Sequence, residues 1–280
     1  MKNIIYLFGI CMLLLLNSCG NNDDSTTTDT TDTPVLPANY FPASLDNYWN
    51  YDVATTDNTN VVTTAEDSLY VASRSGNSFM LDVNTNNIAN GTMNTLLANG
   101  TLTEQGTALT LNSSLELPFD LPGSGAIDFE GAVLYDTSVA ANTTLFTLSD
   151  TFTQDVQGFP VTIAFTLSTE KVQSLSSLTV NSETFSDVEV VDFNLELSVS
   201  TSVDIFGNPT VFSILDPQDV LTIRGYYGPN VGLLKADSDI SFSLNETTVA
   251  LLATFNINLG IPTSSSASSV EELSSYLVEN

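Results

Sequence analysis

The chain has 280 residues, of which 33 are acidic and five are basic, so its formal net charge is −28 at pH 7. Binding to a phosphate backbone needs several Lys or Arg contacts, and this composition therefore excludes a nucleic-acid-binding protein. The chain contains no histidine, which excludes Ser-His-Asp and Cys-His catalysis and the usual zinc ligand sets.

The first 18 residues are expected to form a lipoprotein signal peptide. The positively charged segment Met1-Lys2-Asn3 precedes an apolar run over residues 4–16, which is shorter than the roughly 20 residues needed to cross a membrane. Leu16-Asn17-Ser18-Cys19 then fits a lipobox, the sequence at which bacterial lipoproteins are cleaved and acylated. We expect Cys19 to carry a diacylglycerol and a further acyl chain such as palmitate, which together hold a protein on a membrane.

An ordinary secretory signal is the alternative for this segment. It is disfavoured because no A-x-A-like cleavage site lies nearby. Of the two cysteines, Cys11 would leave with the signal peptide and Cys19 would be acylated. The mature protein is therefore expected to contain no disulfide, although a compartment outside the cytoplasm permits one.

Residues 19–37 are expected to comprise the lipidated cysteine and a disordered tether. Residues 21–33 contain Asp, Thr, Ser and Asn without an apolar side chain, so they cannot bury surface. Asp23-Asp24 resembles the acidic export signal of surface-displayed Bacteroidetes lipoproteins. These features predict an outer-membrane lipoprotein of the bacterial cell envelope that faces the cell surface.

Residues 38–280 are expected to form a β-rich globular part, either one all-β domain or two small ones. In the clearest strand, residues 191–203, odd-numbered apolar residues alternate with even-numbered polar ones. Just upstream Val188 and Val190 lie on the even phase, which predicts a bulge near Val190-Val191. The same period of two marks further strands at Trp49, Tyr51 and Val53; Phe79, Leu81 and Val83; Leu109, Leu111, Leu115 and Leu117; Val161, Ile163, Phe165 and Leu167; and Ile240, Phe242 and Leu244.

One apolar face per strand predicts a mostly antiparallel, curved sheet with little helix, either open and half-barrel-like or stacked as a sandwich. Residues 92–98 fit one or two helical turns. Residues 249–259 fit a long apolar strand in which Leu252 breaks the alternation. Residues 269–278 fit a strand or a helix that begins with a capping box.

Two segments carry short motifs beyond this strand pattern. Tyr40-Phe41-Pro42 is followed by Asn47-Tyr48-Trp49, and Tyr226-Tyr227-Gly228-Pro229 is followed by Asn230-Val231-Gly232-Leu233. These motifs resemble the opening and a later turn of a broad group of Bacteroidetes-type lipoproteins of unassigned function. This chain has Asp46 and Asn230 at two positions where that group usually has glycine. Asn tolerates a left-handed backbone better than most residues. The resemblance implies a curved antiparallel sheet, of the open half-barrel kind found in lipoprotein carriers, and no reaction.

Acidic residues are the candidates for chemistry. Two carboxylates about 5–10 Å apart are enough to hydrolyse a glycoside, but no pair stands out by its spacing in the acidic region Glu104, Glu116, Asp120, Asp128, Glu130 and Asp136. Asp237, Asp239 and Glu246 are the best local group for calcium, although charge on a solvated face explains them better. Arg224, which lies near two tyrosines, is a candidate to hold an acidic ligand group, with a cross-strand ion pair as the favoured alternative.

Taken together, these features predict a membrane-anchored binding protein without catalytic activity, cofactor or metal. Its sheet would present a face or a cavity to a glycan, a lipid or a protein. The first alternative is a structural or adhesive envelope protein, and the second is a glycoside hydrolase that uses carboxylates alone. A cavity lined by Phe and Leu would favour a carrier, whereas a filled core would favour adhesion or display.

Overall fold

The computed structural model describes residues 39–117, 126–156, 158–205, 207–254 and 261–279. The chain divides into two compact units, residues 1–36 and 37–280, and every described residue lies in the second unit. The expected signal peptide, Cys19 and the tether therefore lie outside the described residues. No helix in the described ranges is long and apolar enough to cross a membrane.

The described residues form an all-β structure of twelve strands with two short helices. The strands are, in chain order, β1 (Tyr48–Thr56), β2 (Val62–Ser75), β3 (Ser78–Val83), β4 (Thr101–Gln105), β5 (Ala108–Leu115), β6 (Ile127–Asp136), β7 (Thr143–Val156), β8 (Phe159–Val180), β9 (Glu183–Ile205), β10 (Asn208–Gly228), β11 (Gly232–Ser243) and β12 (Ser264–Leu277). The helices are α1 (Thr92–Ala98) and α2 (Glu246–Thr254).

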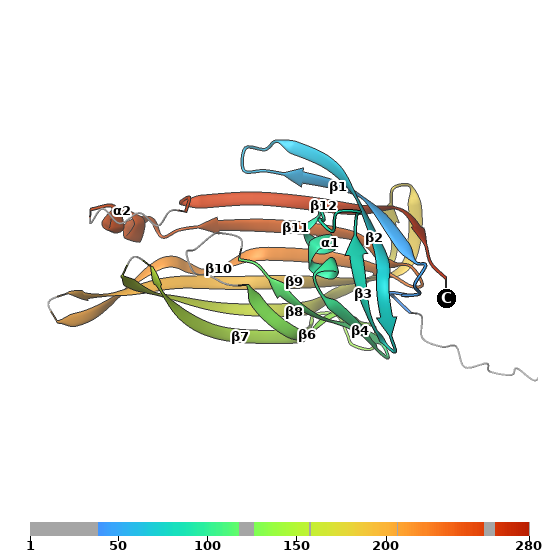
Figure 1. The fold of residues 1–280 in the computed structure, drawn as a ribbon, viewed down its shortest axis with the longest axis horizontal. Helices are drawn as coiled ribbons and strands as arrows, with labels where there is room; N and C mark the ends of the chain where they lie inside the picture. The colour runs from blue at the N-terminus through green and yellow to red at the C-terminus, as the bar shows by residue number, and fades with distance from the viewer. Residues whose placement is uncertain (1–38, 118–125, 157, 206, 255–260, 280) are drawn as a thin grey trace, which may run out of the picture. The chain divides into compact units, whose positions relative to one another are not determined.

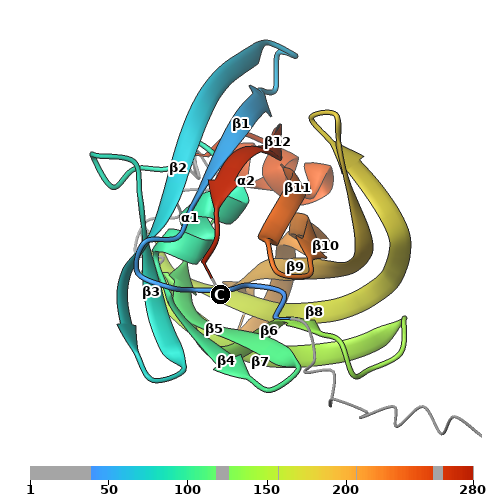
Figure 2. The same cartoon turned by 90° about the vertical axis from the view of Figure 1, so that its right-hand side faces the viewer.

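All twelve strands belong to one antiparallel sheet in the order β6-β5-β4-β3-β2-β1-β12-β11-β10-β9-β8-β7 (Figure 1). The first strand, β1, pairs with the last, β12, and this pairing joins the two ends of the unit. The consecutive strands β6 and β7 do not pair and form the two edges. Figure 2 looks into the ring of strands, which is nearly closed into a barrel. The expected curved antiparallel sheet is confirmed, and it forms a single sheet rather than a sandwich.

Two aromatic residues of β1 show how the predicted alternation builds the core. Trp49 and Tyr51 point inward and are fully buried. The Trp49 Nε1–H donates a hydrogen bond to the Val231 carbonyl oxygen at 2.6 Å, and the Tyr51 hydroxyl donates to the Leu233 carbonyl at 2.9 Å. Each ring therefore buries a large apolar area while its polar atom stays satisfied.

The two motif segments of the sequence meet at this point. In the turn between β10 and β11, Asn230 adopts a left-handed backbone with φ of 61°, as its residue type predicts. Gly232 has φ of 122°, and a Cβ at this position would lie 3.1 Å from Trp49 Nε1. Glycine is therefore required here both for its backbone conformation and for the close approach of the tryptophan.

The long hairpin β8–β9 reaches over to β1 and β12. Asn181, in its turn, donates hydrogen bonds from Nδ2 to Asp52 Oδ2 at 3.2 Å and to the Leu273 carbonyl oxygen at 3.1 Å. The irregular pairing expected near Val190-Val191 is present, and the extra residue lies on β8, opposite these two valines. Both valines are buried, so β9 is covered on both faces at this point.

Helix α1 begins and ends where residues 92–98 were expected to form helical turns. The strand expected over residues 249–259 is wrong for its first part, which belongs to α2. Asn245 starts this helix, because its Oδ1 accepts the Thr248 N–H at 3.0 Å and its carbonyl accepts the Val249 N–H at 2.9 Å. Leu252, which breaks the strand alternation, is the buried apolar residue of α2. The ambiguous segment 269–278 forms most of β12.

Candidate ligand-binding cavity beside helix α1

Helix α1 lies inside the ring of strands, as Figure 2 shows. Met93, Asn94, Leu96 and Leu97 are its buried residues. An isolated helix of seven residues is unstable in water, and no side chain caps its first turn from the preceding residue, Gly91. The sheet must therefore supply the groups that stabilise this helix.

Glu271 of β12 supplies the first of these groups. Its side chain is 0% exposed and points inward, and its Oε1 and Oε2 accept the N–H groups of Met93 and Asn94 at 2.7 and 3.0 Å. A carboxylate is favourable here because it meets free N–H groups and the positive end of the helix dipole. A Cβ on Gly91 would overlap the Glu271 carboxyl group, so glycine leaves the space that this contact needs.

Asp67 of β2 supplies the second group. Its carboxylate accepts the backbone N–H groups of Asn90 and Gly91, both at 2.9 Å at their shortest. It also accepts the side-chain amides of Asn84 at 2.8 Å and Asn94 at 3.1 Å. The loop before α1 and the start of α1 are thus held by two buried carboxylates from strands on the same part of the sheet.

The two carboxylates respond differently to burial. Burial raises the pKa of Glu271 to about 7, against the opposing effect of the N–H groups that it accepts from Met93 and Asn94. Burial would also raise the pKa of Asp67, but its hydrogen bonds from Asn84, Asn90, Gly91 and Asn94 outweigh it and the pKa is lowered. Asp67 is therefore the permanent anion, and Glu271 titrates near neutral pH.

A cavity of about 320 Å³ lies between α1 and the opposite wall of the barrel. Its apolar wall comes from β10, β11, α1 and β5, and its residues are Leu96, Leu115, Leu221, Ile223 and Ile240. The rest of its lining comes from α1, from the residues that flank α1, and from the end of β5. These residues are Asn90, Gly91, Thr92, Thr95, Asn99, Ser114 and Glu116. This volume is at the lower end of the range for ligand pockets, about 300–1,000 Å³.

The interior is thus partly filled and partly open. On one side of α1 the large side chains of Trp49, Tyr51 and Tyr227 pack the core without exposure to solvent. A small hollow of about 10 Å³ lies there, beside Met93 and Thr169. On the other side the cavity is open, and leucine and isoleucine line it rather than phenylalanine. The candidate ligand space is therefore the open cavity on this side of α1.

Unpaired polar atoms surround α1. Ser113 Oγ, Ser238 Oγ and Asn94 Oδ1 are buried and have no hydrogen-bond partner within the described ranges. Ser238 pairs across the sheet with Ile223 and lies two residues from Ile240, so it shares their face of the sheet. Ser113, Ser238 and Asn94 themselves are not among the described residues that line the cavity. Buried polar groups normally have partners. These atoms leave hydrogen-bonding capacity for water in the interior of the barrel.

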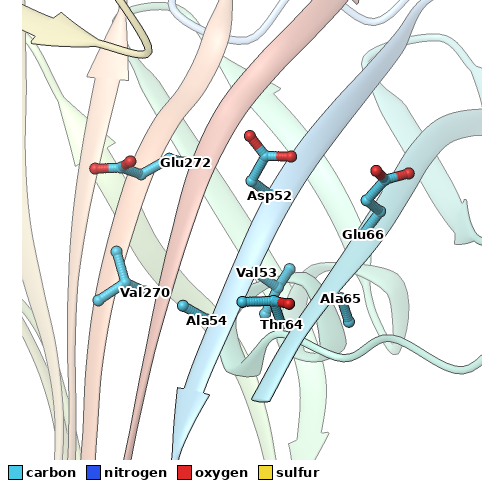
Figure 3. Close-up of a pocket in the computed structure, with 8 residues that line it drawn as sticks. All are labelled: Asp52, Val53, Ala54, Thr64, Ala65, Glu66, Val270 and Glu272. Atoms are coloured by element: carbon cyan, nitrogen blue, oxygen red, sulfur yellow. The ribbon is translucent and has the colours of Figure 1, made fainter. Parts of the chain in front are cut away.

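A second hollow, of about 520 Å³, lies on the outer face of β1, β2 and β12 (Figure 3). Asp52, Glu66 and Glu272 project from three adjacent strands, and Asp52 lies directly opposite both of the others in the strand register. Glu272 is paired with Lys235 at 3.3 Å. Because the groove is open and strongly acidic, the cavity beside α1, which has the more apolar lining, is the better candidate for ligand binding.

The acidic residues singled out in the sequence do not converge. Glu104 forms an ion pair with Arg74, and Asp136 accepts hydrogen bonds from Thr107 and Ser138. Of that group only Glu116 lines the cavity, and Asp120 lies outside the described residues. A hydrolytic carboxylate pair is therefore absent from the described lining of the cavity.

The calcium and anion candidates also have ordinary structural roles. Asp237 is paired with Lys235 at 3.3 Å, and Glu246 begins α2. No group of three Asp, Glu, His or Cys residues that could hold a metal ion occurs within the described ranges. Arg224 forms the favoured cross-strand ion pair, with Nε and Nη2 donating to the two Asp192 oxygens at 2.7 and 2.8 Å. This pairing raises the pKa of Arg224.

Sequence reasoning missed Asp67 and Glu271, the two residues that position α1. A signal for both was available in the strand pattern. Asp67 shares the inward phase of Leu69, and Glu271 shares that of Leu273. A charged residue on the apolar phase of a strand is a buried charge that requires partners.

Comparisons with family models, curated proteins and solved structures give no match to this chain. The cavity and its charge therefore carry the functional argument.

Proposed function

We propose that this protein is a lipid-anchored, non-catalytic envelope protein that binds a small, largely apolar ligand inside its sheet. The observation that carries the proposal is the cavity of about 320 Å³ between α1 and the β10–β11 wall. Its mixture of aliphatic side chains with a few polar groups is typical of sites that bind small molecules. The acylated Cys19 and the tether would hold this site at the membrane surface.

The arrangement favours binding over catalysis. Glu116 is the one acidic residue among the described residues that line the cavity, whereas glycoside hydrolysis needs two carboxyl groups about 5–10 Å apart. The remaining polar groups are amides and hydroxyls, which orient a ligand but need an activating base to act as nucleophiles.

Native mass spectrometry of the protein purified from its own envelope tests this proposal. We expect one retained small molecule per chain, released on collisional activation. Thr95→Phe, which enlarges an exposed side chain of α1 that lines the cavity, is expected to abolish retention. Thr64→Phe, on the outer groove, is the matched control and is expected to leave it unchanged.

A clean ligand-free mass would argue against a carrier, as would equal retention by Thr95→Phe. Either result would favour the structural or adhesive alternative. Circular dichroism of both variants shows whether the sheet is preserved, so loss of retention can be separated from loss of fold.

A further inference from the structure

The lining of the cavity beside α1 has two chemical zones. Leu221, Ile223 and Ile240 form a continuous aliphatic wall on β10 and β11, where Leu221 and Ile240 are direct cross-strand partners. Asn90, Asn99 and the two threonines of α1, Thr92 and Thr95, bring amides and hydroxyls to the side formed by α1. Such a site suits a molecule with an apolar chain and a polar head, rather than a uniformly apolar one.

Glu116 sets the charge of the polar zone. It lines the cavity yet its side chain is exposed, which places it at the rim. No Lys or Arg is among the described residues of the lining. The electrostatic field of the whole chain also repels anions, because the chain has 33 acidic residues and five basic ones. A carboxylate or phosphate head would meet repulsion at the rim and find no counter-charge inside.

We infer that the ligand is a single-chain amphiphile whose head group carries no negative charge, and that Glu116 excludes anionic heads. This inference rests on the proposed function, since it assigns the chemical class of the ligand in the same cavity. The apolar chain lies against the β10–β11 wall. The head lies near Glu116, where a hydroxyl head donates a hydrogen bond to the carboxylate and a cationic head is attracted to its charge.

The volume limits the length of the chain. A cavity of about 150 Å³ takes one benzene ring, so about 320 Å³ accommodates a chain of roughly ten carbons. Decanoate, 1-decanol and decyltrimethylammonium are therefore suitable probes. They share the chain length and differ in the charge of the head group.

The test is a native mass spectrometry titration of the full chain with each probe at low ionic strength. The protein is released from a rigid steroid-based detergent, because a single-chain detergent would itself compete for the cavity. We expect 1-decanol and decyltrimethylammonium to bind at least about fivefold more tightly than decanoate, as befits one exposed charge interaction. Glu116→Lys should tighten decanoate binding by about fivefold and weaken decyltrimethylammonium binding similarly. The control Glu66→Lys makes the same charge change on the outer groove and should leave the order intact.

The outcomes separate the inference from the proposed function. Binding of decanoate as tight as that of the other probes, or no change of preference in Glu116→Lys, would overturn the inference while the carrier proposal stands. Failure of every probe to bind the unaltered chain would overturn both. A second readout needs no variant: raising the salt from about 20 mM to 500 mM should largely remove the discrimination against decanoate, because screening shortens the range of the Glu116 charge.

Discussion

Glu271 Oε1 accepts the backbone N–H of Met93 at 2.7 Å, and this contact joins β12 to α1 across 178 residues of sequence. It fixes the helix that divides the filled core from the open cavity. Because both groups are buried, their interaction governs how the interior responds to pH and to changes in packing.

The first prediction concerns pH. Since the pKa of Glu271 is raised to about 7 in the folded state, the folded protein binds a proton more tightly at this site than the unfolded chain does. The resulting stabilisation is complete below the unfolded pKa of about 4.5 and is lost as pH rises through 7. We expect the free energy of unfolding to fall by about 2–3 kcal/mol between pH 5 and pH 8 from this group.

Urea denaturation followed by the fluorescence of Trp49, the only tryptophan, measures this dependence. In Glu271→Gln the slope between pH 5 and pH 8 should disappear. This variant should also lose about 1–2 kcal/mol of unfolding free energy at pH 5, because the NH₂ group of glutamine cannot accept one of the two backbone N–H groups. An unchanged slope in this variant would show that another group titrates. Asp67 acts in the opposite sense, because its pKa is lowered and its contribution is lost only as pH falls through that lowered value.

Gly91→Ala tests the space around Glu271. Its backbone is extended, with φ of −88°, so alanine meets no conformational penalty there, but the added methyl group overlaps the fixed carboxyl group. We expect a loss of about 1–3 kcal/mol in unfolding free energy. Gly76→Ala is the comparison, because Gly76 has a φ of 60° and open space around it. We expect it to lose about 1–2 kcal/mol of unfolding free energy, because alanine disfavours this left-handed backbone conformation.

The two positions can be distinguished by adding Glu271→Ala. Removal of the carboxyl group should relieve the crowding at Gly91→Ala and leave the penalty at Gly76→Ala unchanged. Additive effects of Gly91→Ala and Glu271→Ala would contradict the contact.

Lys171 and Glu189 form a buried ion pair between β8 and β9, at 2.8 Å with side chains only 4% and 8% exposed. Lys171→Met alone leaves Glu189 buried without its counter-charge and should reduce stability by about 3–5 kcal/mol. The double variant Lys171→Met with Glu189→Leu should recover most of that loss. The more exposed pair of Lys235 and Glu272, at 3.3 Å with side chains 24% and 36% exposed, is the control, and Lys235→Met should have an effect of under about 1 kcal/mol.

Lipidation is tested at the two cysteines. Metabolic labelling with an alkyne analogue of palmitate should mark the unaltered protein and Cys11→Ala but not Cys19→Ala. Incorporation of the label into Cys19→Ala would refute the proposed anchor. Partition into the detergent phase should follow the label.

The parts of the fold that depend on local pattern were predictable. The period of two identified the strands around Trp49, Phe193 and Ile163, because each strand has one buried face and the pleat repeats every two residues. It failed over residues 249–254, where an apolar composition without alternation fits a short helix as well as a strand. The cap at Asn245 decides between them, and it is visible only when the backbone bonds are known.

The candidate site was harder to predict from the sequence, because it is formed by residues that are distant in sequence. The cavity lining joins α1 and the end of β5 to β10 and β11, on the opposite wall of the barrel. No local pattern relates Leu96 to Ile223 or Asp67 to Glu271. Closure through the pairing of β1 with β12 brings these residues together, and that pairing carries no short-range signal.

The most direct measurement is a crystal structure of the protein grown with 10-bromodecan-1-ol, in which anomalous scattering locates the bromine. Binding of the chain beside α1 places the bromine against Leu221, Ile223 and Ile240. An anomalous peak confined to the outer groove of Asp52 and Glu272, or found only between molecules in the crystal, would contradict a ligand site inside the sheet.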